Sequence, residues 1–131
     1  MTKILIVDDH DSVRRALRDW LAINLPGCRF YEAITGEQAI ALCQTEKPAI
    51  VLMDYGLATI NGIEATRRIK DLSPEIQVVM ISIHEDQCYQ IAAAEAGAHR
   101  YVPKSRMQKT QVPILNDLVR AKRSPKPARV N

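Results

Sequence analysis

The chain has 131 residues, enough for one domain that buries roughly two thirds of the surface its unfolded form exposes, and too few for a second full domain. It carries 18 basic and 15 acidic residues, but five of the basic ones fall in the last twelve positions, where no acidic residue occurs. The remaining body, with 13 basic and 15 acidic residues, is mildly acidic. We therefore expect no direct binding of nucleic acid by this domain.

The cysteines and the hydropathy pattern indicate a soluble protein of the reducing cytoplasm. Cys28, Cys43 and Cys88 are odd in number, far apart and without metal-ligand spacing, which predicts three buried thiols. No apolar run approaches the ~18 residues of a membrane span, and residues 1–3 lead into a predicted strand without a signal-peptide pattern. We expect a cytoplasmic protein that has no membrane partner.

Five short β-like runs alternate with five helical patterns, which predicts a parallel sheet with helices on both faces. The first strand is predicted at 3–7, and a more polar edge strand at 28–33. The helix between them ends at 24–27, and its apolar face, with the tryptophan in the core, consists of Val13, Ala16, Leu17, Trp20 and Leu21.

The middle of the chain continues this alternation. Thr35 opens a capping box for a helix that ends near 46–48, and the wholly apolar run 50–53 is predicted as a central strand. Asn61 is a good N-cap for a helix that runs through Lys70. The fourth strand is predicted at 77–81 and leads directly into Ser82.

The last third begins with an alanine-rich helix at 86–96, followed by Gly97 at a predicted left-handed position. A short strand is predicted at 100–102. The last helix is predicted to begin near Thr110, because Pro113 is tolerated in a first turn and would break a helix interior. We thus predict one domain at 1–123 and a basic, proline-containing tail or linker at 124–131.

Three carboxylates stand where predicted strands end: Asp8 and Asp9 after the first strand, and Asp54 after the third. The carboxyl ends of parallel strands meet at one edge of a sheet, where α/β folds bind ligands. Like charges 4 Å apart at a protein surface repel by about 4 kcal/mol, which a hard divalent cation relieves. Mg²⁺ prefers such oxygen ligands, so we predict a magnesium site.

Ser82 and Lys104 end two later strand-like runs, and with the carboxylates they fit the formation of an aspartyl phosphate. That chemistry needs a nucleophilic carboxylate, here Asp54, a bridging cation, and donors for the phosphoryl oxygens. Taken singly, each of these residues is usually a cap, a turn residue or a surface residue. Their joint placement at four strand ends supports the hypothesis.

These residues make the sequence resemble the receiver domain of bacterial two-component response regulators, from Lys3 to about Lys122. The resemblance implies a doubly wound, flavodoxin-like α/β fold with five parallel strands in the order 2-1-3-4-5. The matching segments are IVDDH at 6–10, LMD at 52–54, NG at 61–62, IS at 81–82, EAGA at 95–98 and YVPK at 101–104.

The resemblance also implies a function in phosphorelay signal transduction. Asp54 would accept a phosphoryl group from a histidine kinase or a histidine phosphotransfer protein. Mg²⁺ would be bound directly by Asp9, Asp54 and the Gly56 carbonyl, and largely through water by Asp8. The domain would not be an enzyme beyond phosphorylating itself from small donors and dephosphorylating itself.

A second group of residues would form the switch. Ser82 and Lys104 would bind the phosphoryl oxygens, and Tyr101 would be the aromatic residue whose rotamer follows a shift of Ser82. This coupling would alter a surface that binds other proteins.

The segments 8–10, 61–65 and 83–86 most resemble receivers that precede a LuxR-type helix-turn-helix domain in transcription regulators. The residues after Arg123 are too few for such a domain. The chain is then either a single-domain receiver that acts on a downstream protein effector, which we slightly favour, or a fragment of a regulator whose DNA-binding domain is missing. A homodimer is a further candidate assembly.

Two departures from the family pattern bear on the site. Leu57 and Ala58 stand where the family often has Met-Pro, which predicts a more mobile loop and a less certain metal geometry at Gly56. Lys104 is followed by Ser105 where many receivers have proline. A cis bond at this position is therefore in doubt, since for serine it costs about 3 to 4 kcal/mol.

A Mg²⁺-dependent phosphatase with an aspartyl nucleophile is the enzyme alternative. Such enzymes usually place a second Asp two residues after the nucleophile as the general acid. That position is Gly56 after Asp54 and Asp11 after Asp9, so Asp11 keeps this alternative open. An FMN-binding flavodoxin is disfavoured because the acidic segment 8–11 would repel the FMN phosphate.

Overall fold

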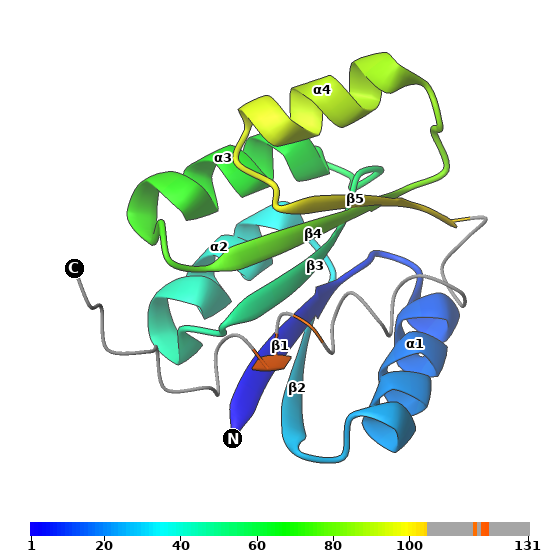
Figure 1. Cartoon of the computed structure of the whole chain (residues 1–131), viewed down its shortest axis with the longest axis vertical. Helices are drawn as coiled ribbons and strands as arrows, with labels where there is room; N and C mark the ends of the chain where they lie inside the picture. The colour runs from blue at the N-terminus through cyan, green and yellow to red at the C-terminus, as the bar shows by residue number, and fades with distance from the viewer. Residues whose placement is uncertain (105–116, 118, 121–131) are drawn as a thin grey trace.

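The computed structural model describes residues 1–104, 117, 119 and 120, in which strands and helices alternate (Figure 1). The predicted strands and the first four predicted helices are present. The predicted start of the last helix and the tail at 124–131 lie outside the described residues. The Lys104–Ser105 bond lies at their limit, because Ser105 is not described. The elements are β1 (Thr2–Val7), α1 (Asp11–Asn24), β2 (Cys28–Ala33), α2 (Gly36–Glu46), β3 (Ile50–Asp54), α3 (Gly62–Leu72), β4 (Gln77–Ser82), α4 (Gln87–Glu95) and β5 (Arg100–Pro103).

The strands form one parallel sheet in the order β2-β1-β3-β4-β5, which confirms the predicted topology. β1 and β3 are neighbours although α1, β2 and α2 separate them in the chain. Val7 lies opposite Met53, and Asp54 lies opposite Ile81. The residues that follow Val7 therefore emerge beside Asp54, at the edge of the sheet where ligands bind in folds of this kind.

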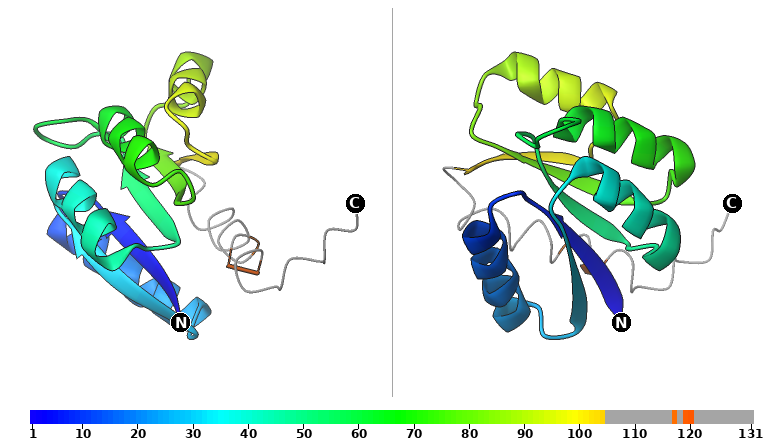
Figure 2. Two further views of the ribbon diagram at one scale, coloured as in Figure 1. Left: turned by 90° about the vertical axis from the view of Figure 1, so that its left-hand side faces the viewer. Right: turned by 180° about the vertical axis from the view of Figure 1, so that it is seen from behind.

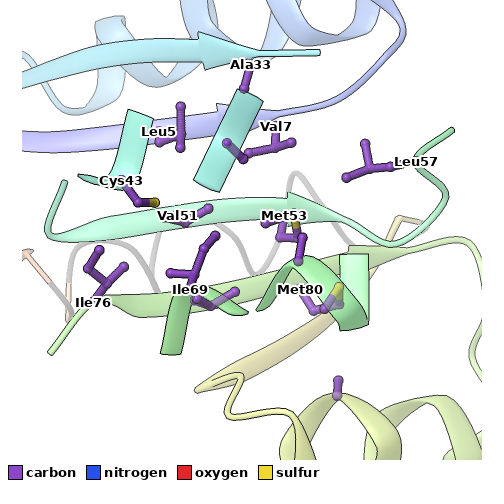
Figure 3. Close-up of a cluster of buried hydrophobic side chains, with 14 residues drawn as sticks. Leu5, Val7, Ala33, Cys43, Val51, Met53, Leu57, Ile69, Ile76 and Met80 are labelled. Carbon is purple, nitrogen blue, oxygen red and sulfur yellow. The ribbon is translucent and has the colours of Figure 1, made fainter. Parts of the chain in front are cut away.

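Two hydrophobic clusters cover the two faces of the sheet, because successive side chains of a strand point to opposite sides. Ile4 and Ile6 of β1 pack with Leu17 and Leu21 of α1 in the first cluster, which also includes Val119. Figure 2 shows α1 on one face of the sheet, with α2 and α3 on the other. The second cluster, drawn in Figure 3, joins α2, α3 and α4 to the sheet through residues such as Leu5, Val7, Cys43, Val51, Met53, Ile69 and Ala93.

Side-chain burial corrects three details of the sequence prediction. In α1, Val13 and Ala16 of the predicted apolar face are exposed and Arg14 is buried, because the first turns of the helix lie beside the charged end of the sheet. Trp20 is only partly buried and packs on the rim of the first cluster. Cys28 and Cys43 are buried as predicted, whereas Cys88 is exposed on α4.

Local hydrogen bonds explain where several helices begin and end. The Thr35 hydroxyl accepts a bond from the Gln38 N–H, and the Gln38 side chain accepts one from the Ile34 N–H in place of the Thr35 N–H of a standard capping box. The Asn61 side chain caps α3 by accepting from the Glu64 N–H at 2.9 Å. Gly97 follows α4 with φ +105°, as predicted. None of the described helices has the length and apolar character needed to cross a membrane.

Candidate functional site

The three predicted carboxylates come together at the carboxyl ends of β1 and β3. Asp8 and Asp54 are buried, with 5% and 4% of their surface exposed, while Asp9 faces solvent. Ligand atoms of Asp8, Asp9, His10 and Asp54 all lie within 4.8 Å of one another. Carboxylate oxygens at this spacing suit a hard divalent cation such as Mg²⁺.

His10 is a member of this cluster that the sequence analysis named only as part of a family motif. Its Nδ1 lies 3.2 Å from Oδ1 of Asp8 and 3.0 Å from Oδ1 of Asp9. Its backbone N–H also donates to Oδ1 of Asp8 at 2.9 Å. The signal for it was its position directly after the two aspartates, at the N-cap of α1.

Lys104 reaches Asp54 from the end of β5, with 3.3 Å between Nζ and Oδ1. Burial raises the pKa of the Asp54 carboxyl, and the nearby charge of Asp8 raises it further. Lys104 and the backbone N–H of Gly56 oppose this effect and lower the pKa. The pKa is raised overall, so the surrounding protein groups do not fully stabilise the negative charge of Asp54. A bound cation would stabilise that charge.

The loop after β3 is anchored on both sides of Gly56. The Tyr55 N–H donates to the Ile81 carbonyl at 2.9 Å, and the Gly62 N–H donates to the Tyr55 carbonyl at 2.9 Å. Gly62 packs so closely that a Cβ there would lie 2.4 Å from the Asp54 carbonyl oxygen, whereas a Cβ on Gly56 would meet no atom within 4 Å.

The residues that replace Met-Pro in this loop also have definite contacts. Leu57 is buried in the second hydrophobic cluster. The Thr59 hydroxyl donates to the Glu37 carboxylate of α2, at 2.6 Å from Oε1. These contacts hold the chain on either side of Ala58, where the sequence predicts a more mobile loop.

Ser82 and Tyr101 meet at the loop between β4 and α4. Ser82 is buried, and its Oγ accepts a hydrogen bond from the His84 N–H at 3.0 Å. The Tyr101 hydroxyl donates to the His84 carbonyl at 2.6 Å. Burial raises the pKa of Tyr101, and a hydrogen bond with Ser82 partly offsets the rise. The two predicted switch residues are therefore linked both through His84 and by their own hydrogen bond.

A cavity of about 250 Å³ opens between these groups, enough for a phosphoryl group and several waters. The structure thus brings Asp54, Gly56, Ser82 and Lys104 to one cavity. Asp8 and Asp9 lie beside Asp54 in the acidic cluster, and Tyr101 contacts Ser82. Its lining consists of His10, Asp54, Tyr55, Gly56, Ser82, Ile83, His84 and Lys104.

An aromatic cluster beside the cavity could not be anticipated from the sequence. His84 stacks on Tyr89 with ring centroids 4.1 Å apart, and Tyr55 meets both rings edge-on at 5.4 Å. The three rings come from the end of β3, the β4–α4 loop and α4, so no regular spacing in the chain connects them.

Comparison with known proteins identifies the family to which this domain belongs. Residues 4–114 match the family model described as the response regulator receiver domain. The response regulator GacA of Pseudomonas aeruginosa is 37% identical over 105 residues, which cover 79% of this chain and 49% of that protein. The transcriptional activator protein ExaE of Pseudomonas putida is 37% identical over 102 residues, covering 78% of this chain and 48% of that protein.

Solved structures agree with this assignment. A two-component response regulator of the LuxR family from Aurantimonas sp. SI85-9A1 superposes with a TM-score of 0.82 at 33% identity, over 91% of this chain and 86% of that one. A two-component response regulator from Clostridium difficile has a TM-score of 0.86 at 19% identity, over 95% of this chain and 100% of that one, a likeness of fold alone. The chain spans about half the length of the curated relatives it matches. It belongs to the response regulator receiver domain family.

Proposed function

We propose that this domain accepts a phosphoryl group on Asp54 from a histidine kinase or a histidine phosphotransfer protein, in a reaction that requires Mg²⁺. One observation carries the proposal. The buried Asp54 carboxylate lines a cavity, with the Lys104 ammonium 3.3 Å away and two further aspartates in the same cluster.

The residues of the cavity divide the chemistry between them. An Asp54 oxygen attacks phosphorus, and the bond between phosphorus and the donor atom breaks, leaving its electron pair on the donor. Lys104 and the Ser82 hydroxyl interact with the phosphoryl oxygens, whose charge grows in the transition state. Mg²⁺, when bound, neutralises part of this charge.

The carboxylates have the donor chemistry to hold that cation. We assign Asp9, Asp54 and the Gly56 carbonyl as direct ligands and Asp8 as a ligand acting mainly through water. Support for this assignment comes from the common cluster of the three carboxylates and from the exposure of Gly56 on the rim of the cavity.

The signal leaves the site through the β4–α4 loop. The His84 N–H donates a hydrogen bond to Ser82 Oγ, so His84 moves when Ser82 moves toward a phosphoryl oxygen. The Tyr101 hydroxyl is bonded to the His84 carbonyl, so its rotamer responds to the same shift. α4 begins three residues later, and its surface changes for a partner protein.

The partner on the output side follows from the relatives. The relatives, of which the chain covers about half, include a protein named as a transcriptional activator, so we propose regulation of transcription through a DNA-binding domain or through a separate effector. A homodimer is a further assembly for the phosphorylated state.

We place the receiver domain at 1–123.

The phosphatase alternative receives no support from the structure. Asp11, its candidate general acid, forms an ion pair with Arg14 at 2.8 Å, and the hydrogen bond from Arg14, together with its charge, lowers the pKa of Asp11. A carboxyl with a lowered pKa is a poorer general acid near neutral pH.

Labelling with acetyl phosphate tests the proposal. With Mg²⁺ we expect intact-mass measurement to show one added phosphoryl group, none in Asp54→Ala, and a reduced rate in Asp9→Asn because a metal ligand is lost. Asp71→Ala, which changes an exposed aspartate of α3, is the control and should be labelled like the wild type. Unchanged labelling of Asp54→Ala would overturn the site assignment, and steady release of phosphate that Asp11→Ala abolishes would favour the phosphatase.

A further inference from the structure

Arg14 is a buried basic residue in the first turn of α1. Among the described residues it is the only basic residue that is almost completely buried, with 5% of its surface exposed. Taking a guanidinium out of water is unfavourable unless its N–H groups find acceptors. The acceptors that Arg14 finds indicate what it does.

All three guanidinium nitrogens of Arg14 have an oxygen partner. Nη1 donates to the backbone carbonyl of Asp8 at 2.9 Å, and Nε donates to Oε1 of Glu32 at 2.8 Å. Nη2 pairs with Oδ1 of Asp11 at 2.8 Å. A planar guanidinium with its donors engaged in fixed directions holds its acceptors in a fixed relative position.

The bond to Asp8 is the one that concerns the metal cluster. The Asp8 N–H donates to the Ala33 carbonyl of β2 at 3.1 Å, and Arg14 donates to the carbonyl of the same Asp8 residue. The Arg14 N–H also donates to the His10 carbonyl at 2.9 Å. The backbone that carries Asp8, Asp9 and His10 is therefore tied to β2 and α1 within one turn of the helix.

We propose that Arg14 is a positioning residue for the metal site: it sets the direction in which the Asp8 and Asp9 carboxylates point, without touching the cation. The inference rests on the proposed function. Mg²⁺ demands near-ideal octahedral geometry, so a small rotation of its carboxylates costs affinity. Groups that support metal ligands from behind commonly contribute about 10-fold to 100-fold in affinity.

Arg18 supplies a matched control one turn further along α1. It donates to Oε2 of Glu32, the same carboxylate that Arg14 binds, but its other partner among the described residues is the exposed Asp19. Arg14→Met and Arg18→Met each remove one guanidinium from Glu32 and keep an apolar stem. Only Arg14→Met removes the contact to the Asp8 carbonyl.

Calorimetric titration with Mg²⁺ is the primary measurement, supported by the melting temperature with and without Mg²⁺. We expect Arg14→Met to bind Mg²⁺ at least about tenfold more weakly than the wild type, and Arg18→Met to stay within about twofold. Acetyl phosphate labelling at saturating Mg²⁺ should reach nearly the wild-type rate in Arg14→Met, because the acceptor and its donors are intact.

Two results would overturn the inference. One is a lower melting temperature of Arg14→Met with unchanged Mg²⁺ affinity, which would make Arg14 a purely structural residue. The other is an equal loss of affinity in both variants, which would assign the effect to Glu32. If Arg14→Met does not fold, Arg14→Lys replaces it, with an expected loss of at least about threefold, since an ammonium cannot reproduce the planar fork; wild-type affinity in that variant would overturn the inference too.

The same experiment separates this inference from the proposed function. A wild-type protein that is not labelled on Asp54 contradicts the proposed function, whatever Arg14 does. A wild type that is labelled normally, beside an Arg14→Met protein with wild-type Mg²⁺ affinity, contradicts only the role of Arg14.

Discussion

The ends of β1 and β3 form one wall of the cavity around Asp54, and the ends of β4 and β5 form the other. The first wall carries the aspartates, and its backbone is held by Arg14 at Asp8 and by close packing of Gly62 on Asp54. The second wall carries Ser82 and Lys104. Its loop is held by the hydrogen bonds that His84 makes with Ser82 and Tyr101.

The helices that follow the two walls differ in the same way. α3 has the Asn61 cap, and it buries Gly62, Ala65, Thr66 and Ile69. α4 has no side-chain hydrogen bond from its N-cap Asp86 and buries only Ala93. Elements with few buried contacts are the first to move. The wall that carries the aspartates is therefore firmly placed, and the wall that carries Ser82 and Lys104 leads into a helix that is easier to displace.

The largest expected effect comes from crowding the firm wall. Gly62→Ala would place a Cβ 2.4 Å from the Asp54 carbonyl oxygen, a backbone atom that cannot move without disturbing β3. We expect a loss of about 3 kcal/mol in the free energy of unfolding, measured with urea. Gly56→Ala, in open space on the same loop, should stay within about 0.5 kcal/mol. Equal losses would show that the two ends of the loop are equally tight.

The second effect concerns charge in the same wall. Because the pKa of Asp54 is raised in the folded protein, ionisation of Asp54 opposes folding. Stability from this group is complete below the unfolded pKa and is lost as the pH rises through the raised folded pKa. Without Mg²⁺, Asp54→Asn should therefore be more stable at pH 7, because it removes the cost of burying the Asp54 charge and the repulsion by Asp8, which is about 1 to 4 kcal/mol for charges 4 Å apart.

Thermal melting across pH checks this prediction. The advantage of Asp54→Asn should shrink as the pH falls and wild-type Asp54 becomes protonated. Asp71→Asn, which changes an exposed aspartate of α3, is the control and should show no such gain. An advantage that persisted unchanged in acid would mean that charge is not its cause.

The smallest effect compares the two helices directly. Asn61→Ala removes the bond to the Glu64 N–H and should lower the free energy of unfolding by about 1 kcal/mol. Asp86→Ala removes no side-chain cap bond and should change it by less than about 0.5 kcal/mol. Urea unfolding of both variants measures the difference. An equal loss of free energy of unfolding would show that the N-caps of α3 and α4 contribute equally to stability.

Much of the fold followed from local patterns. Apolar runs at 50–53 and 77–81, capping residues at Thr35 and Asn61, and a glycine after α4 act over a few residues, so the elements they predict are found. The amphipathic face of α1 was less well predicted. A helical repeat locates a stripe of side chains, but burial at each end of it depends on what lies opposite, and opposite Arg14 lies Glu32 of β2.

The sequence by itself determined that Asp8, Asp9 and Asp54 share one edge of the sheet, because strand ends in a parallel α/β fold meet there whatever their separation in the chain. Only the tertiary structure decided what surrounds them. Glu32 of β2 holds Arg14 behind Asp8, and the rings of Tyr55, His84 and Tyr89 meet through packing between segments distant in the chain. Such contacts depend on the three-dimensional arrangement of several segments at once, and no periodicity along one segment encodes them.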